Sequence, residues 1–264
     1  MTRAPGSMAH ARSAEGRDLT AGNLHRAIWY LAPPMMLETG ILSVAQVLDA
    51  YWVGQLGSAA LAAVTISTTV RWVLNSLANG LGIGGMAVVA RQIGARDEEA
   101  AGHAAGQTIL LGLCASLLLA GLGLAVARPL LSLLGAGEEI LPLALAYLHV
   151  SLVGVFTLIF SFIINAMLRG AGEARWSMRV LLLSTTVTIL LEPVLILGLG
   201  PIPSLGVVGS AWAFVLGYGA GLILQMVLLV QGWTRICIRL HHLWPDLGLM
   251  KQILGISLPS TVQM

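Results

Sequence analysis

The sequence has little charge and almost no cysteine. Only 10% of its 264 residues are charged, whereas 57% are hydrophobic, and a soluble domain would carry about 25% charged residues to coat its surface. The two cysteines, Cys114 and Cys237, provide neither a disulfide framework nor the spacing of metal ligands. Aromatic residues are also sparse at 6%, but the 31 glycines are typical of helices that pack closely in lipid. The composition therefore predicts an integral membrane protein that contacts the lipid bilayer.

Motifs of enzymes and nucleotide-binding proteins are missing as well. The sequence contains no H-E-x-x-H, no G-x-S-x-G and no phosphate-binding loop. Gly80, Gly82 and Gly85 match the pattern G-x-G-x-x-G, but no strand precedes them, so we expect them to serve helix packing. We predict no enzymatic activity, no cofactor, no resident metal and no nucleic-acid partner.

Six hydrophobic runs are each long enough for a transmembrane helix, which needs about 20 apolar residues. They are apolar throughout, whereas the strands of a membrane barrel alternate over about ten residues, so the predicted fold class is all-α. The runs are Ala27–Val53, Ala59–Ala90, Ala104–Ala127, Ile140–Leu168, Trp176–Leu199 and Val207–Gly232. Together they predict a six-helix transmembrane lobe over residues 25–233.

The basic residues divide unevenly between the two sides of that lobe. Residues 1–24 are polar and contain no signal-peptide core, which predicts a disordered cytoplasmic tail. With the N-terminus inside, twelve of the 14 Lys and Arg residues lie on the cytoplasmic side, as the positive-inside rule requires. We expect a multi-pass protein of the plasma membrane, specifically a bacterial inner membrane.

Two further segments follow the sixth run. Residues 234–249 place apolar and charged side chains on opposite faces at helical spacing, which predicts a cytoplasmic interfacial helix ended by Pro245, with His241 and His242 solvated. Residues 250–264 are apolar but too few to cross a bilayer. Their Lys-to-Pro spacing repeats the Arg-to-Pro spacing of the first run, so we expect a truncated seventh transmembrane helix that begins a second half.

The first run carries two carboxylates. Asp49 follows Glu38 by eleven residues, so the two share a helix face about 16 Å apart, and Gln46 lies one turn from Asp49. Ionisable groups within membrane spans cost roughly 2.5 to 3.5 kcal/mol on insertion scales, which favours a functional role in a water-filled cavity. The alternative is that neighbouring groups neutralise these carboxylates for structural reasons.

The second run contains a polar stripe with a period of four residues. Ser67, Arg71, Asn75 and Asn79 lie on one side of an otherwise apolar helix, and such a stripe avoids lipid. Arg71 is expected at a depth similar to that of Asp49. It could pair with Asp49, or its side chain could extend to the outer headgroups.

The fifth run carries Thr185, Thr188 and Glu192 on one face. A buried carboxylate of this kind can exchange a proton, whereas a hydrated one can bind Na⁺ together with other oxygens. Either reaction would couple an ion to a conformational change.

Prolines interrupt both acid-bearing helices. Pro33 and Pro34 lie in the first run, and Pro193 directly follows Glu192. Because proline cannot donate a hydrogen bond to the carbonyl one turn earlier, we expect these positions to act as hinges. In the alternative interpretation the prolines only shape helix packing.

Four segments resemble the multidrug and toxic compound extrusion (MATE) family. They are PPMMLETGILSVAQVLDAYWVGQLGSAALAAV, GLGIGGMAVVARQIGARDEEAA, NAMLRGAGEARWSM and LEPVLILGLGPIPSLGVVGSAWA, and they occur in the family's order and spacing. The resemblance implies one six-helix lobe of a twelve-helix secondary active exporter, whose C-terminal lobe the chain lacks. Such exporters move cationic or amphipathic small molecules outward in exchange for H⁺ or Na⁺.

The resemblance also assigns roles to individual residues. Asp49 and Glu192 fall on the family's ion-coupling acids, which makes both of them candidate ligands for Na⁺. The fifth-helix acid is usually Asp, and the residue four positions earlier is often Asn where this sequence has Thr188. Glu38 and Arg71 do not belong to the family pattern. These departures leave the coupling ion and the substrate open.

Two other functions stay open. A flippase for lipid-linked oligosaccharides would have a related lobe, but it would be expected to present a strongly cationic cavity, to which only Arg71 could contribute here. A non-transporting membrane partner protein is the second alternative. Half of a major-facilitator transporter is disfavoured, because RQIGARDEEAAG lacks that family's basic G-x-x-x-D-R pattern.

Overall fold

The computed structural model describes residues 24–198, 203–231, 233, 234, 236 and 240–263, with the backbone alone for residues 24–35, 38, 240 and 262. The helices are α2 (Leu24–Gly54), α3 (Ser58–Gly94), α4 (Glu98–Leu133), α5 (Leu141–Val153), α6 (Val155–Gly170), α7 (Ala174–Leu197), α8 (Val207–Val230), the short 3₁₀ helix η2 (Leu240–Leu243) and α9 (Leu247–Val262). No strand occurs among the described residues. The predicted all-α fold is confirmed.

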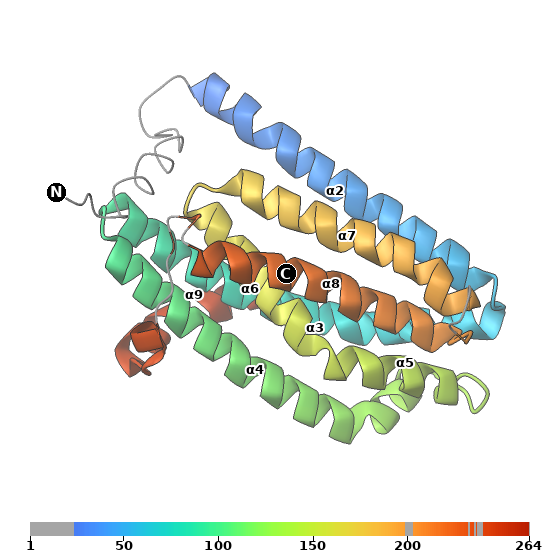
Figure 1. Cartoon of the computed structure of the whole chain (residues 1–264). Helices are drawn as coiled ribbons and strands as arrows, with labels where there is room; N and C mark the ends of the chain where they lie inside the picture. Colours follow the sequence, from blue (N-terminus) through green and yellow to red (C-terminus); the bar gives the residue numbers. More distant parts are fainter. Residues whose placement is uncertain (1–23, 199–202, 232, 235, 237–239, 264) are drawn as a thin grey trace.

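The long helices pack side by side as a bundle. α2 lies along α7 and α7 lies along α8, whereas α4 and α5 lie on the other side of the bundle (Figure 1). α6 packs against α3, α4 and α8, and its apolar side chains, such as Ile159, Ile163 and Met167, are buried. Large apolar side chains such as Val47 and Leu117 are exposed on the outside of the bundle, as expected for a surface that faces lipid.

Among the described residues, helix length and composition support four crossings of a membrane, or five if the bent pair α5–α6 forms one span. α3, α4, α7 and α8 each qualify alone, and α5 with α6 forms a bent pair that qualifies together. These crossings correspond to the second through sixth hydrophobic runs. The first run lies in α2, whose 31 residues give a length of about 46 Å, more than the hydrocarbon core requires.

The fourth predicted span, Ile140–Leu168, is two helices rather than one. α5 and α6 meet at Gly154 with a bend of 49°. A Cβ atom at Gly154 would collide with the side chain of Val215 on α8, so only glycine allows this close approach. Beyond the bend, the Thr157 hydroxyl donates to the Gly154 carbonyl at 2.7 Å and satisfies an oxygen at the break.

The prolines predicted to act as hinges lie inside continuous helices. Pro33 and Pro34 fall within α2, and Pro193 falls within α7. α7 continues for one turn beyond Pro193 to Leu197, and the following Gly198 adopts a left-handed backbone with φ +75°. Hinge motion at these positions stays a prediction.

The segment after α8 differs from the expected interfacial helix. Of the predicted helix 234–249, the described residues contain only the 3₁₀ turn η2 and the first residues of α9. Pro245 cannot donate to a helical carbonyl, and Asp246 begins a new helix by accepting hydrogen bonds from the amides of Gly248 and Leu249. The expectation that both histidines are solvated is also wrong for His242, whose side chain is 2% exposed.

The structure describes the C-terminal segment of the chain but almost none of the predicted N-terminal tail. The predicted tail, residues 1–24, lies outside the described residues except for Leu24, which begins α2. Residues 250–264 fall largely in α9, which packs against α3 (Figure 1). At Gly80 and Gly84 of α3 an added Cβ would collide with Thr261 and Ser257 of α9, so these glycines allow the close contact. A membrane crossing by α9 stays a prediction.

Candidate functional site

Five helices place polar side chains near one end of the bundle. Asp49 lies in the last two turns of α2 and Arg71 in the first half of α3, while Tyr147 lies in α5. Glu192 lies near the end of α7 and Ser210 in the first turn of α8. Since α2 and α3 run in opposite directions, as do α7 and α8, these positions meet where α2 leads into α3 and α7 leads into α8 (Figure 1). We refer to these five residues as the polar cluster.

Two short hydrogen bonds join the helices of the polar cluster. The Ser210 hydroxyl donates to Asp49 Oδ1 at 2.6 Å, which links α8 to α2. Arg71 Nη1 donates to the Tyr147 hydroxyl at 2.6 Å, which links α3 to α5. Each bond involves a charged group, so each is stronger than a bond between neutral partners.

The guanidinium group of Arg71 is turned into the bundle. Its central carbon lies 4.2 Å from the ring centroid of Phe214 on α8 and 5.8 Å from that of Tyr147. These contacts place the charge over aromatic faces, where it is stabilised by the ring quadrupoles. The direct hydrogen-bond partner of Arg71 is therefore Tyr147 rather than Asp49, and the side chain does not extend outward to headgroups.

Glu192 is the most deeply buried charged side chain of the polar cluster. It is 4% exposed, and its Oε2 atom has no hydrogen-bond partner among the described residues. Asp49 and Arg71 both act on it electrostatically, with opposite signs. A desolvated carboxylate oxygen without a hydrogen-bond partner makes the charged form of this group costly.

The structure leaves the two predicted threonines outside these contacts. Thr188 is buried, but its hydroxyl donates to the Ser184 carbonyl at 2.9 Å and packs against Gly217 of α8. Thr185 is buried on the same helix. Neither has a hydrogen bond to Asp49 or Glu192 among the described contacts.

The remaining predicted lining residues are dispersed. Gln46 is exposed on α2, one turn from Asp49. Asn79 is half-buried and donates to the Asn75 carbonyl at 3.0 Å, while Asn75 Oδ1 is buried without a partner in the described part of the chain. The side chain of Glu38 lies outside the described residues. The structure thus brings together Asp49, Arg71 and Glu192 from the predicted set.

Sequence reasoning missed Tyr147, Ser210 and Phe214. Tyr147 is fully buried although it carries a hydroxyl group, and Ser210 is also buried. A tyrosine inside an apolar run is a usable signal, because a buried hydroxyl needs a hydrogen-bond partner. Ser210 gives no such signal, since serine is common where membrane helices pack.

The family model MatE matches residues 34–194, which is more than half of the chain. This chain belongs to the MATE family. The MATE chain is 33% identical to the FAD transporter of Shewanella oneidensis over 182 residues, which is 69% of this chain and 40% of that protein. It is 30% identical to the probable multidrug resistance protein YoeA of Bacillus subtilis over 236 residues, which is 88% of this chain and 51% of YoeA. The chain therefore spans about half the length of these relatives or less.

Solved structures agree with this membership. A crystal structure of MATE in the bent conformation superimposes with a TM-score of 0.85 at 33% identity, covering 94% of this chain and 55% of the other. A MOP superfamily transporter from Pyrococcus furiosus gives a TM-score of 0.85 at 34% identity, covering 94% of this chain and 54% of the other. The MATE chain thus has the fold of half a membrane transporter, and the predicted family is confirmed.

Proposed function

We propose that this MATE chain provides the N-terminal half of a secondary active exporter. In this proposal it pairs with a C-terminal lobe in the plasma membrane of a bacterium, and the N-terminus is cytoplasmic. The complete protein expels cationic or amphipathic compounds in exchange for H⁺ or Na⁺. Relatives described as multidrug proteins support the substrate class, among them the multidrug export protein MepA of Staphylococcus aureus, which is 25% identical over 89% of this chain.

The observation that carries this proposal is the buried Glu192 beside Asp49. Asp49 lies on α2 and Glu192 on α7, and these two helices pack against each other. The negative charges of the two carboxylates repel each other within the polar cluster. Binding of a cation or a proton relieves that repulsion, so an ion gradient can drive a change in how α2 and α7 pack. Release of the ion on the other side of the membrane restores the repulsion.

We favour H⁺ over Na⁺ as the coupling ion. A sodium site needs several oxygen ligands around one centre. The Ser210 hydroxyl already directs its proton at Asp49, and the Thr188 hydroxyl directs its proton at its own helix. A proton needs only the unpartnered Glu192 oxygen.

The test is transport by the complete exporter in proteoliposomes, with a fluorescent cation and an imposed pH or Na⁺ gradient. We expect Glu192→Gln and Asp49→Asn each to lower the rate of gradient-driven export by at least about tenfold, which corresponds to about 1.4 kcal/mol of activation free energy. Glu138→Gln is the matched control, since Glu138 is exposed in the loop between α4 and α5. Undiminished export by both variants would remove the coupling assignment, and a response to the Na⁺ gradient alone would exclude H⁺.

The flippase alternative has less support. A carrier of lipid-linked pyrophosphate needs several cations, but in the polar cluster of the described structure Arg71 is the one cation, and it is bound to Tyr147 and stacked on Phe214. A non-transporting partner protein would tolerate neutralisation of both acids. The transport experiment therefore also separates these two alternatives from the exporter.

A further inference from the structure

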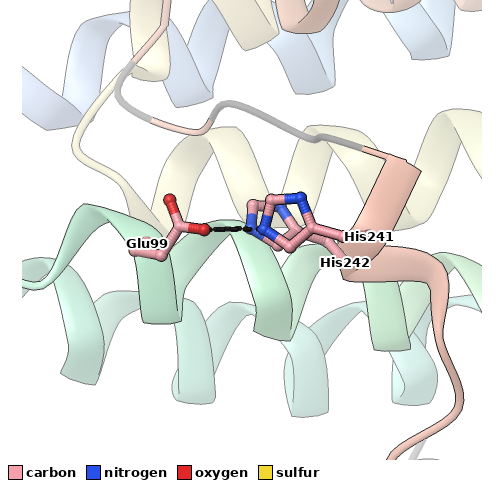
Figure 2. Close-up of side chains that lie close together, drawn as sticks. All are labelled: Glu99, His241 and His242. Atoms are coloured by element: carbon pink, nitrogen blue, oxygen red, sulfur yellow. Dashed lines mark hydrogen bonds and ion pairs between the residues drawn. The ribbon is translucent and has the colours of Figure 1, made fainter.

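Three side chains with metal-binding atoms converge far from the polar cluster, at the end of the bundle where α3 leads into α4. Glu99 lies in the first turn of α4, and His241 and His242 lie in η2 (Figure 2). The Nε2 atoms of His241 and His242 lie 2.8 Å and 2.9 Å from Glu99 Oε1. One ligand atom from each residue lies within 4.8 Å of the other two.

The chemistry of these donors suits a divalent transition metal. Two imidazole nitrogens and one carboxylate oxygen form a ligand set that Zn²⁺ commonly takes, with a fourth position open to water. With both imidazoles neutral, the three ligands carry one negative charge, which attracts a dication. Ligand distances of about 2.0–2.2 Å in tetrahedral geometry separate the ligand atoms by about 3.3–3.6 Å. Each histidine Nε2 atom therefore needs to move only about half an ångström further from Glu99 Oε1.

The exposure of two of the three ligand side chains allows this adjustment. Glu99 and His241 are 59% and 58% exposed, so each can rotate without disturbing the core. The side chain of His242 is 2% exposed, so its surroundings hold it in place more firmly than the other two ligands. The rings of His241 and His242 lie 4.1 Å apart and are inclined by 62°.

The backbone that carries the histidines is held against α4 independently of their side chains. The buried Gln107 donates from Nε2 to the carbonyls of His242 and Trp244, at 2.9 Å and 2.7 Å. Its Oε1 accepts from the amide of Asp246 at 2.9 Å. Gly106 lies so close to the His242 carbonyl that a Cβ would meet it at 2.5 Å. The ligands are thus positioned before a metal binds, which lowers the entropic cost of binding.

A second pair of side chains flanks the three ligands. His103, one turn after Glu99 on α4, lies 3.5 Å from Asp246 through Nε2 and Oδ2. Its ring centroid lies 6.1 Å from that of His242.

We propose that Glu99, His241 and His242 form a Zn²⁺ site, which nothing in the transport mechanism requires. The site joins positions 142 residues apart and fastens the segment after α8 to the start of α4. Because this segment leads directly into α9, bound Zn²⁺ fixes where α9 begins relative to the six-helix lobe.

The test is Zn²⁺ binding by the full chain in detergent, purified through an affinity tag without histidine. We expect one Zn²⁺ per chain in competition with a chromophoric chelator, and Co²⁺ is expected to give the intense visible absorption of a four- or five-coordinate site. Glu99→Gln and His241→Ala each are expected to weaken the affinity by at least about tenfold. Both residues are exposed, so neither variant disturbs the core.

The matched control is His149→Ala, which removes a histidine of α5 that belongs to neither cluster. It is expected to bind Zn²⁺ as the unchanged chain does. Zn²⁺ should also raise the unfolding temperature of the unchanged chain and of this control, but not that of the two ligand variants. Equal affinities in all four proteins, the absence of stoichiometric binding, or a six-coordinate Co²⁺ spectrum would each overturn the proposal.

Discussion

At the scale of single residues, the hydrogen bond between Arg71 and Tyr147 satisfies polar atoms that have few other partners inside the bundle. Arg71 and Tyr147 form a pair in which each satisfies a polar atom of the other inside the bundle. Tyr147 is 0% exposed, so its hydroxyl has no access to water as a substitute partner. Removing one member therefore leaves the other unsatisfied.

We predict that Tyr147→Phe lowers the stability of the folded chain. Hydrogen bonds between membrane helices contribute about 0.6 kcal/mol on average and up to about 1.7 kcal/mol, and the upper range applies here because Arg71 is charged. The free energy of unfolding in mixed micelles with sodium dodecyl sulfate measures this loss. Tyr51→Phe is the control, because Tyr51 is 59% exposed on α2. Equal effects of the two substitutions would contradict the assigned role of the Tyr147 hydroxyl.

The same scale shows what the sequence could and could not predict. Asp49 and Glu192 were predictable because carboxylates inside apolar runs are rare and expensive. Ser210 was not, because serine is common where membrane helices pack. The Tyr147 hydroxyl indicated only that it needs a partner, and the tertiary structure shows that this partner is Arg71. Glu99 and His241 are 142 residues apart, and no local pattern indicates that they meet.

At the scale of helices, apolar run length predicted the approximate bounds of the long elements, except that the fourth run forms the two helices α5 and α6. The bend at Gly154 was not predictable, since glycine is abundant here and its role depends on Val215 of another helix. The 3₁₀ turn η2, which forms where an interfacial helix was predicted, also depends on a contact with another helix. There Gln107 supplies hydrogen bonds to the segment's backbone that a regular helix would otherwise provide from within.

The start of α9 is predicted to respond to acid. The amides of Leu249 and Gly248 donate to the carboxylate of Asp246 and hold its pKa below its ordinary value of 3.8. Because its pKa is lowered in the folded chain, the charged Asp246 cap stabilises the helix fully at pH values above the ordinary pKa. This contribution is lost as the pH falls through the lowered pKa. Hydrogen exchange of the two amides, corrected for intrinsic rates, should therefore show protection at neutral pH that declines in strong acid.

Asp246→Ala should remove this protection at every pH. Asp97→Ala is the matched control, because Asp97 caps α4 in the same way through the amide of Ala100. It is expected to loosen the start of α4 and leave the amides of Gly248 and Leu249 unchanged. Unaltered exchange at those two amides in Asp246→Ala would contradict the cap.

At the scale of the whole molecule, the charges separate along the bundle. The polar cluster lies near one end, while several basic side chains lie at the other, where α3 and α6 end and α7 begins; these are Arg91, Arg96, Arg169, Arg175 and Arg179. The positive-inside rule predicts that the basic end lies in the cytoplasm.

This orientation predicts which loops a membrane-impermeant maleimide reaches in intact cells. In a background with Cys114 and Cys237 replaced by serine, Glu138→Cys between α4 and α5 should be labelled from outside. Ala95→Cys between α3 and α4 should be labelled only after the cells are opened. Both positions are exposed, so accessibility within the fold is matched. The reverse pattern of labelling would invert the assigned orientation.

The contact between α7 and α8 also determines which parts of the lobe can shift independently. At Gly217 and Gly221 of α8, an added Cβ would collide with Thr188 and Ser184 of α7, so the two helices touch almost backbone to backbone along this seam. Such close interlocking resists sliding. We therefore expect that any rearrangement that breaks the bond from Ser210 to Asp49 moves α2 relative to α7 and α8, which stay together and keep Glu192 and Phe214 on the same side.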